Sequence, residues 1–226
     1  KRNSWQEYQK DVADDGYYYL RSCIRQNFFP GSEKAFIRIL REELGRDLYD
    51  DPAHTSCTGI GYHSDVVPHQ TIMTVVARQF ALAAEARYEN LAVSCITSFG
   101  VYTETLETWR EFPEVEELII GGWGGEFEVE EKVREALYRA TGRELRKPKN
   151  VSHASDIIFH HREAIRQRAK YPLVNRRTGE PLRGVEHIGC HYAKIFPKEG
   201  IGGVEFPYVL AGMIESWGGE VVDYPE

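Results

Sequence analysis

The sequence has no long apolar run, and none of its runs approaches the roughly 18 residues of a membrane span. Residues Lys1–Glu7 are polar, so they lack the apolar core of a signal peptide. We therefore expect a cytoplasmic protein with no membrane span. Thiols stay reduced in that compartment, so the four cysteines are expected to be free or metal-bound rather than paired in disulfides.

An excess of basic residues is also missing, since the net charge is −7 at pH 7. Proteins that bind nucleic acid usually carry a basic patch, so we expect no nucleic-acid partner. The glycine-rich segment 121–125 lacks the Lys-Ser/Thr pair of a phosphate-binding loop and is expected to be a flexible turn. No C-x-x-C pair is intact, which argues against a redox protein that works through free thiols.

Strand-like and helix-like segments alternate along the 226 residues, a length that can bury one good core or two modest ones. The expected strands lie at 17–20 and 91–94, and the expected helices at 33–44, 70–88, 104–110, 129–140 and 151–169. This alternation predicts an α/β fold with a mainly parallel sheet. Residues 25–30 and 119–125 are expected to be loops.

Local signals set the ends of these helices. Ser32 is expected to cap the helix at 33–44, and Gly45 to end it. His153, His160 and His161 lie on the expected helix at 151–169, where most histidines are surface residues or satisfied core residues.

Three cysteines, Cys23, Cys57 and Cys95, each lie just past an apolar run in a loop-like setting. Cys57 stands between Ser56 and Thr58 and is followed by two glycines, which let the backbone approach another group closely. Loops at the carboxyl ends of parallel strands converge on one edge of the sheet. Thiolates gathered there suit a metal cluster. Alternatively, each cysteine is a small buried hydrophobic residue.

The chain also contains an internal repeat, in which residues 17–30 match residues 184–197. Proline follows cysteine by seven positions in both copies, from Cys23 to Pro30 and from Cys190 to Pro197. An apolar helical stretch follows in each copy and ends at a glycine, Gly45 in the first and Gly218 in the second. A short strand comes next, at 47–52 in the first copy and 220–225 in the second. The matched spacing favours duplication.

The second copy stops just where a counterpart of Cys57 is due, so the second site is expected to be incomplete as given. We therefore expect an N-terminal arm over residues 1–15 and an N-terminal repeat over 16–150. The start of a C-terminal repeat is expected over 151–226.

From about Tyr17 onward, this layout resembles the cysteine-rich CCG domain found in the B subunit of heterodisulfide reductase and in its relatives, including components of heterodisulfide-reductase-like sulfur-oxidising complexes. Each of the two repeats in that family has a cysteine after the first strand, a Cys-Cys-Gly-type loop and a C-x-x-C. The resemblance includes the linker at 148–153 and the Gly-Cys-His-Tyr at 189–192.

The resemblance implies roles for all four cysteines. Cys23 matches the first cysteine of the N-terminal motif, Cys57 the second of its pair, and Cys95 the first of the C-x-x-C. Cys190 matches the first cysteine of the C-terminal motif. Two positions depart from the family pattern, because Ser56 and Ser98 stand where thiols are expected. These serines, with His187 and His191 beside Cys190, are candidates to orient the metal ligands without binding the metal themselves.

The family implies a [4Fe-4S] cluster, which can be of the non-cubane type, and redox chemistry on a small thiol, a disulfide or a sulfur carrier. The implied partners are the iron-sulfur and flavin subunits of such a complex. For the N-terminal half, three alternatives stay open. It holds a cluster on three thiolates, or a zinc ion on these thiolates with His63 or His69, or no metal. In the last case the chemistry lies in the C-terminal half. A non-catalytic scaffold subunit is the competing function.

Overall fold

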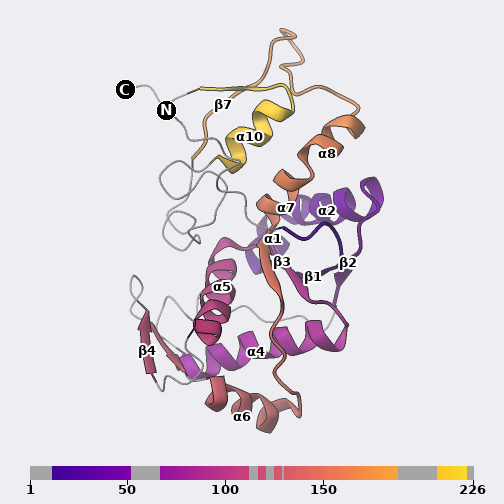
Figure 1. The fold of residues 1–226 in the computed structure, drawn as a ribbon. Coiled ribbons are helices and arrows are strands. Elements are labelled where there is room, and N and C mark those ends of the chain that lie inside the picture. The colour runs from indigo at the N-terminus through magenta and orange to yellow at the C-terminus, as the bar shows by residue number, and fades with distance from the viewer. Residues whose placement is uncertain are drawn as a thin grey trace.

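The computed structural model describes residues 12–51, 67–111, 117–120, 125–128, 130–187 and 208–222. The strands are β1 (Tyr17–Leu20), β2 (Leu48–Asp50), β3 (Asn90–Val93), β4 (Glu117–Ile120), β5 (Gly125–Glu128), β6 (Asn150–His153), β7 (Arg183–Gly184) and β8 (Glu220–Val221). The helices are α1 (Cys23–Phe28), α2 (Pro30–Arg38), η2 (Ile39–Glu43), α4 (His69–Glu85), α5 (Ile96–Glu111), α6 (Glu130–Thr141), α7 (Ala154–His160), α8 (Arg162–Arg168) and α10 (Val209–Ser216). Figure 1 shows this alternation, which confirms the predicted α/β fold class.

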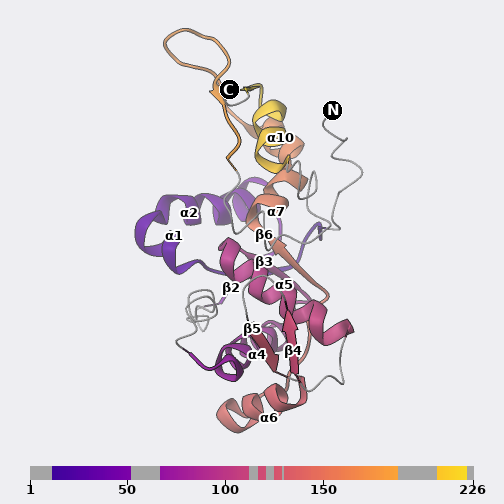
Figure 2. The same ribbon diagram turned by 90° about the vertical axis from the view of Figure 1, so that its left-hand side faces the viewer.

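A four-stranded parallel sheet in the order β2-β1-β3-β6 forms the centre of the molecule. Its central strands are buried on both faces, and the three consecutive tyrosines of β1 are fully buried. Strands of a parallel sheet carry large apolar side chains on both faces, because helices cover both sides of the sheet. Figures 1 and 2 show α4 and α6 on one side of the sheet and α2 and α7 on the other.

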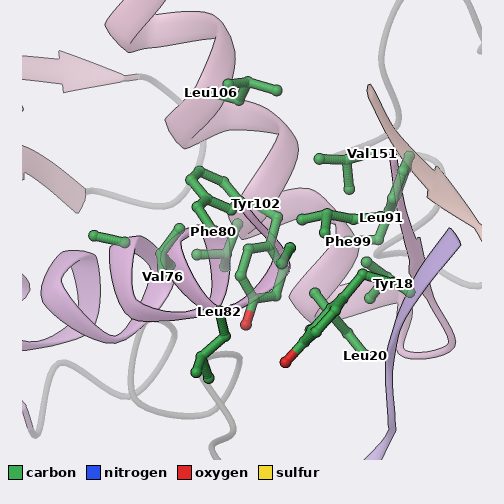
Figure 3. Close-up of a cluster of buried hydrophobic side chains, with 14 of the residues drawn as sticks. Tyr18, Leu20, Val76, Phe80, Leu82, Leu91, Phe99, Tyr102, Leu106 and Val151 are labelled. Carbon is green, nitrogen blue, oxygen red and sulfur yellow. The ribbon is translucent and has the colours of Figure 1, made fainter. Parts of the chain in front are cut away.

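The larger core lies between the sheet and helices α4 and α5. Tyr18 and Leu20 of β1, with Leu91 of β3, point toward Phe80 of α4 and Tyr102 of α5 (Figure 3). The opposite face packs Tyr17 and Tyr19 against Phe36, Leu40 and Ile157. Successive strand residues therefore enter different cores, as the period of two in a β-strand requires.

The helix predicted at 33–44 begins earlier than the sequence analysis placed it. Pro30 is its first residue, a position that suits proline because the first N–H groups of a helix have no intrahelical partner. Ser32 is therefore not the cap; its hydroxyl donates to the carbonyl of Phe29 at 2.8 Å. The predicted loop at 25–30 is also wrong, because Cys23–Phe28 is a helix capped by Ser22, whose Oγ accepts from the Arg25 N–H. Gly45 has φ +65° and ends the segment as predicted.

The single helix predicted at 151–169 is wrong. Residues Asn150–His153 form β6, which pairs with β3, and two short helices follow. Strands β4 and β5 pair as an antiparallel hairpin, so residues 119, 120 and 125 lie in strands and the loop predicted there is wrong at these three positions. Helix α5 begins at Ile96 rather than at 104. The helices at 70–88 and 129–140 are confirmed within a few residues by α4 and α6.

The small parallel pair β7-β8 agrees with the predicted repeat. The repeat aligns Tyr17 with Gly184 and Leu48 with Val221. In the structure Tyr17 pairs with Leu48, and Gly184 pairs with Val221. Gly218, which the repeat aligns with Gly45, likewise has a positive φ, +85°. The division into two repeats remains a prediction. Strand β6 lies at its proposed boundary and belongs to the first sheet.

Among the residues that the structure describes, no helix combines the length and the apolar character that a membrane crossing needs.

Candidate metal-cluster site

The carboxyl ends of three neighbouring strands lie side by side at one edge of the sheet. Leu20 at the end of β1 pairs with Val93 at the end of β3, which in turn pairs with His153 at the end of β6. The residues that follow these strands therefore meet at this edge. Cys23 follows β1 after two residues, and Cys95 follows β3 after one. The predicted convergence is confirmed for these two cysteines.

Cys23 is the first residue of α1 rather than part of a loop. The Ser22 hydroxyl caps this helix by accepting from the Arg25 N–H at 3.2 Å, and the Asn27 side chain donates to the Cys23 carbonyl at 2.8 Å. These two contacts fix the backbone on either side of the thiol. Cys23 is half-buried and is not part of a disulfide.

Cys95 stands immediately before α5, and its carbonyl accepts the Phe99 N–H at 2.8 Å. It thus occupies the capping position of the long helix α5, which fixes the backbone at this cysteine. Ser98, the residue in place of the second cysteine of a C-x-x-C, lies in the first turn of α5 and is buried. Residues three apart share one face of a helix, so Cys95 and Ser98 face the same side.

A buried carboxyl group lies under this edge. Glu33 of α2 is 5% exposed, and the Ser94 hydroxyl donates to its Oε2 at 3.4 Å. Burial raises the pKa of Glu33 above its ordinary value, against the opposing effect of the Arg25 charge. Ser94 links this carboxyl group to Cys95, its neighbour in sequence. Glu33 is not among the predicted site residues, because its place on an expected helix gives no sign that it is buried.

His153 also lies at this edge, at the end of β6. Its Nδ1 accepts the Ser155 N–H at 3.3 Å and so caps α7, and its ring lies 5.7 Å from that of Phe99. Burial, with the charge of Arg25, lowers the pKa of His153 to about 3, so its imidazole is neutral at physiological pH. The sequence analysis placed His153 on a helix. The polar pair Ser155-Asp156, typical of a first helical turn, is the signal that could have corrected this.

We expect the variant His153→Asn to remove part of the protein's sensitivity to acid. In the unfolded chain His153 has a pKa near 6.5, whereas in the folded protein it is not protonated until the pH falls to about 3. Between these values only the unfolded state binds the proton, so the free energy of unfolding falls as the pH drops below 6.5. These two pKa values imply that the free energy of unfolding at pH 5 is about 2 kcal/mol lower than at pH 8. Asparagine keeps the cap but cannot titrate. Urea unfolding at pH 8 and pH 5 measures the difference between wild type and variant.

Glu33 and His161 also titrate, but they do so in both proteins, so the comparison isolates His153. The exposed His187 provides the matched control, and His187→Asn should keep the acid sensitivity of the wild type. An equal loss of stability in wild type and His153→Asn would contradict the prediction.

The remaining predicted site residues are spread differently. Four of them, Ser56, Cys57, Cys190 and His191, lie outside the described residues, as does the alternative zinc ligand His63. His187 is exposed beyond β7, and His69 is the half-buried first residue of α4. The structure therefore brings two of the four predicted cysteines to one edge and leaves the other two unplaced.

The donors at this edge suit a soft metal centre. Cysteine thiolates are the ligands of iron-sulfur clusters, and two cysteines stand here just after neighbouring strands, each at the start of a helix. Two thiols do not complete a cluster, so the fit depends on a third. Cys57 is the sequence candidate for it, in the segment between β2 and α4.

No family model matches the sequence. A comparison with characterised proteins finds the B subunit of the ferredoxin:CoB-CoM heterodisulfide reductase of Methanosarcina acetivorans, which is 24% identical over 217 residues. The match covers 96% of this chain but 65% of that protein, so the chain spans slightly less than two thirds of its relative's length. This similarity along almost the whole chain supports membership of the family of heterodisulfide reductase B subunits, the family that the cysteine layout predicts.

Proposed function

We propose that this chain is an iron-sulfur redox subunit of a heterodisulfide-reductase-like complex. The relation to a reductase component supports an oxidoreductase at the level of the family. The observation that carries the proposal is the placement of Cys23 and Cys95 at one carboxyl edge, each at the start of a helix. The proposal includes a cytoplasmic location, because thiols stay reduced there.

Cys23, Cys95 and Cys57 are the residues that would hold a [4Fe-4S] cluster in this half of the chain. When bound, such a cluster supplies electrons one at a time and an iron that can take a sulfur ligand. Cys23 stands at the start of α1 and Cys95 immediately before α5, so the backbone of each helix fixes the position of its cysteine. The neutral imidazole of His153 adds no positive charge to the edge.

The proposed substrate is a small thiol, its disulfide, or a sulfur atom on a carrier. The relative's name specifies ferredoxin and the CoB-CoM heterodisulfide. For this chain we propose the broader class, with electrons exchanged through partner subunits that carry iron-sulfur clusters or flavin. The half-buried state of both thiols agrees with such a role, because a substrate sulfur must reach the site.

A zinc-binding or non-catalytic scaffold subunit is the second candidate. The hydroxyl groups of Ser56 and Ser98 favour it, because serine is a harder and poorer ligand for iron than cysteine. Ser98 is buried in the first turn of α5, three residues after Cys95, and offers a hydroxyl oxygen where the family pattern has a thiol.

Iron and acid-labile sulfide per chain, measured after anaerobic purification, separate these candidates. We expect a brown protein that contains several irons with matching sulfide. Zinc at one per chain would support the zinc-binding subunit. A colourless protein without iron or zinc would leave the scaffold.

A further inference from the structure

Three metal-ligating side chains meet at the opposite edge of the sheet from the cysteines. Asp14 precedes β1, whereas His160 is the last residue of α7 and His161 joins α7 to α8. Helix α7 starts at the carboxyl edge, where His153 caps it, and leads back to the amino edge. The fold thus joins two segments that are far apart in the sequence.

The distances are close to those of a coordination site. Asp14 Oδ1 lies 3.6 Å from His160 Nε2 and 4.0 Å from His161 Nδ1, and one ligand atom from each residue lies within 4.8 Å of the others. Bonds of 2.0–2.1 Å in a tetrahedral zinc site separate the ligand atoms by about 3.3 Å. A small rotation of Asp14, whose side chain is 64% exposed, brings its carboxylate into that range.

His161 is the buried member of the cluster. Its side chain is 4% exposed, and the ring nitrogen that approaches Asp14 is Nδ1. The other ring nitrogen, Nε2, has no hydrogen-bond partner in the described part of the chain, so either nitrogen could serve as a ligand. Burial lowers the pKa of His161, as do the charges of His160 and Arg46.

Arg46 is the group that opposes a cation here. Its Nη1 lies 2.9 Å from Asp14 Oδ2, so it pairs with one carboxylate oxygen while the other faces the histidines. A carboxylate can bind an arginine and a metal ion through different oxygens. The arginine charge still weakens cation binding through simple repulsion.

We propose that Asp14, His160 and His161 form a binding site for a divalent transition-metal cation such as Zn²⁺, with water completing the coordination. Imidazole with a single carboxylate is a donor set that suits zinc and its neighbours. The ion would join the segment before β1 to the junction of α7 and α8. This inference is independent of the proposed redox function, because it involves no cysteine.

Titration of the reduced, metal-free protein with Co²⁺ tests the site. Cobalt bound to cysteine gives an intense sulfur-to-metal band in the near ultraviolet, whereas cobalt on nitrogen and oxygen gives only weak visible bands. We expect Asp14→Asn and His160→Gln to weaken the visible component at least about tenfold and to leave the sulfur band unchanged. Both side chains are exposed or half-buried, so these variants should fold.

Two further variants make the test specific. Arg46→Gln should bind Co²⁺ about fivefold more tightly, because it removes the opposing charge. Glu163→Gln removes an exposed negative charge near His161 but no ligand, and it should bind like the wild type. Unchanged Co²⁺ affinity in both Asp14→Asn and His160→Gln would overturn the proposal, as would weaker binding in Arg46→Gln.

Discussion

Replacing Cys95 by alanine is expected to lower the iron bound by the anaerobically purified protein at least about tenfold. The proposed N-terminal cluster depends on three thiolates, and the variant leaves two of them. Cys95 also stands at the start of α5, where the helix backbone fixes its position, so alanine removes the sulfur ligand without disturbing the backbone hydrogen bond to Phe99. Iron and sulfide analysis, with the visible absorption of the cluster, measures the loss.

A second substitution tests the same site in the opposite direction. Ser98→Cys restores the C-x-x-C in the first turn of α5, on the face that Cys95 shares, and should make the bound iron more resistant to a chelator. Thr97→Cys adds a thiol to the same turn at the wrong spacing and serves as the matched control. Full retention of iron in Cys95→Ala, with no difference between the two added cysteines, would contradict the assignment of this edge.

The parts of the fold that the sequence predicts are those with a strong local pattern. Helix α4 has a long apolar face, and α6 ends at Gly142, whose φ is +71°. The strands β1 and β3 are short apolar runs. In each case local preference and tertiary structure agree, so residue patterns alone suffice.

Strand β6 shows where such reasoning fails. Its four residues are Asn-Val-Ser-His, and the last three are buried although two of them are polar. No local pattern marks this segment as a strand, because its burial comes from pairing with β3 and from the helices on both faces. The residue pattern therefore favours joining this segment to the helix that follows it.

The candidate site divides in the same way. The place of the cysteines could be predicted, because their position just after apolar runs can be read from the sequence. Parallel strands then bring such positions to one edge of the sheet. Glu33 and His153 could not, because their importance comes from burial beside that edge. A carboxyl group on a helix has no distinctive sequence signal, and the Ser155-Asp156 pair marks the start of α7 but not the burial of His153. Their shifted pKa values come from neighbours that only the fold supplies.

The core between α4 and α5 gives the largest expected effect on stability. Phe80 is 1% exposed, and its ring packs against Tyr102 at 5.8 Å and, edge-on, against Trp109 at 6.3 Å (Figure 3). Phe80→Ala removes both contacts and leaves a cavity that rigid neighbours cannot fill, so it should cost about 3–5 kcal/mol of unfolding free energy. A domain of ordinary stability has only about 5–15 kcal/mol, so the variant should be close to unfolding. Urea titration at pH 8 of the metal-free protein measures this difference.

Two control substitutions separate packing from general damage. Phe80→Leu keeps much of the buried volume and should lose clearly less stability than Phe80→Ala. Tyr138→Ala removes an aromatic ring from α6 that is 62% exposed, and it should change stability by no more than about 0.5 kcal/mol. If Phe80→Ala and Tyr138→Ala had equal effects, Phe80 would not be at the centre of the core, and the packing of α4 against α5 would be wrong. The free energy of unfolding should therefore rise from Phe80→Ala to Phe80→Leu to wild type. This order tests directly the packing of α4 and α5 on the sheet whose carboxyl edge carries Cys23 and Cys95.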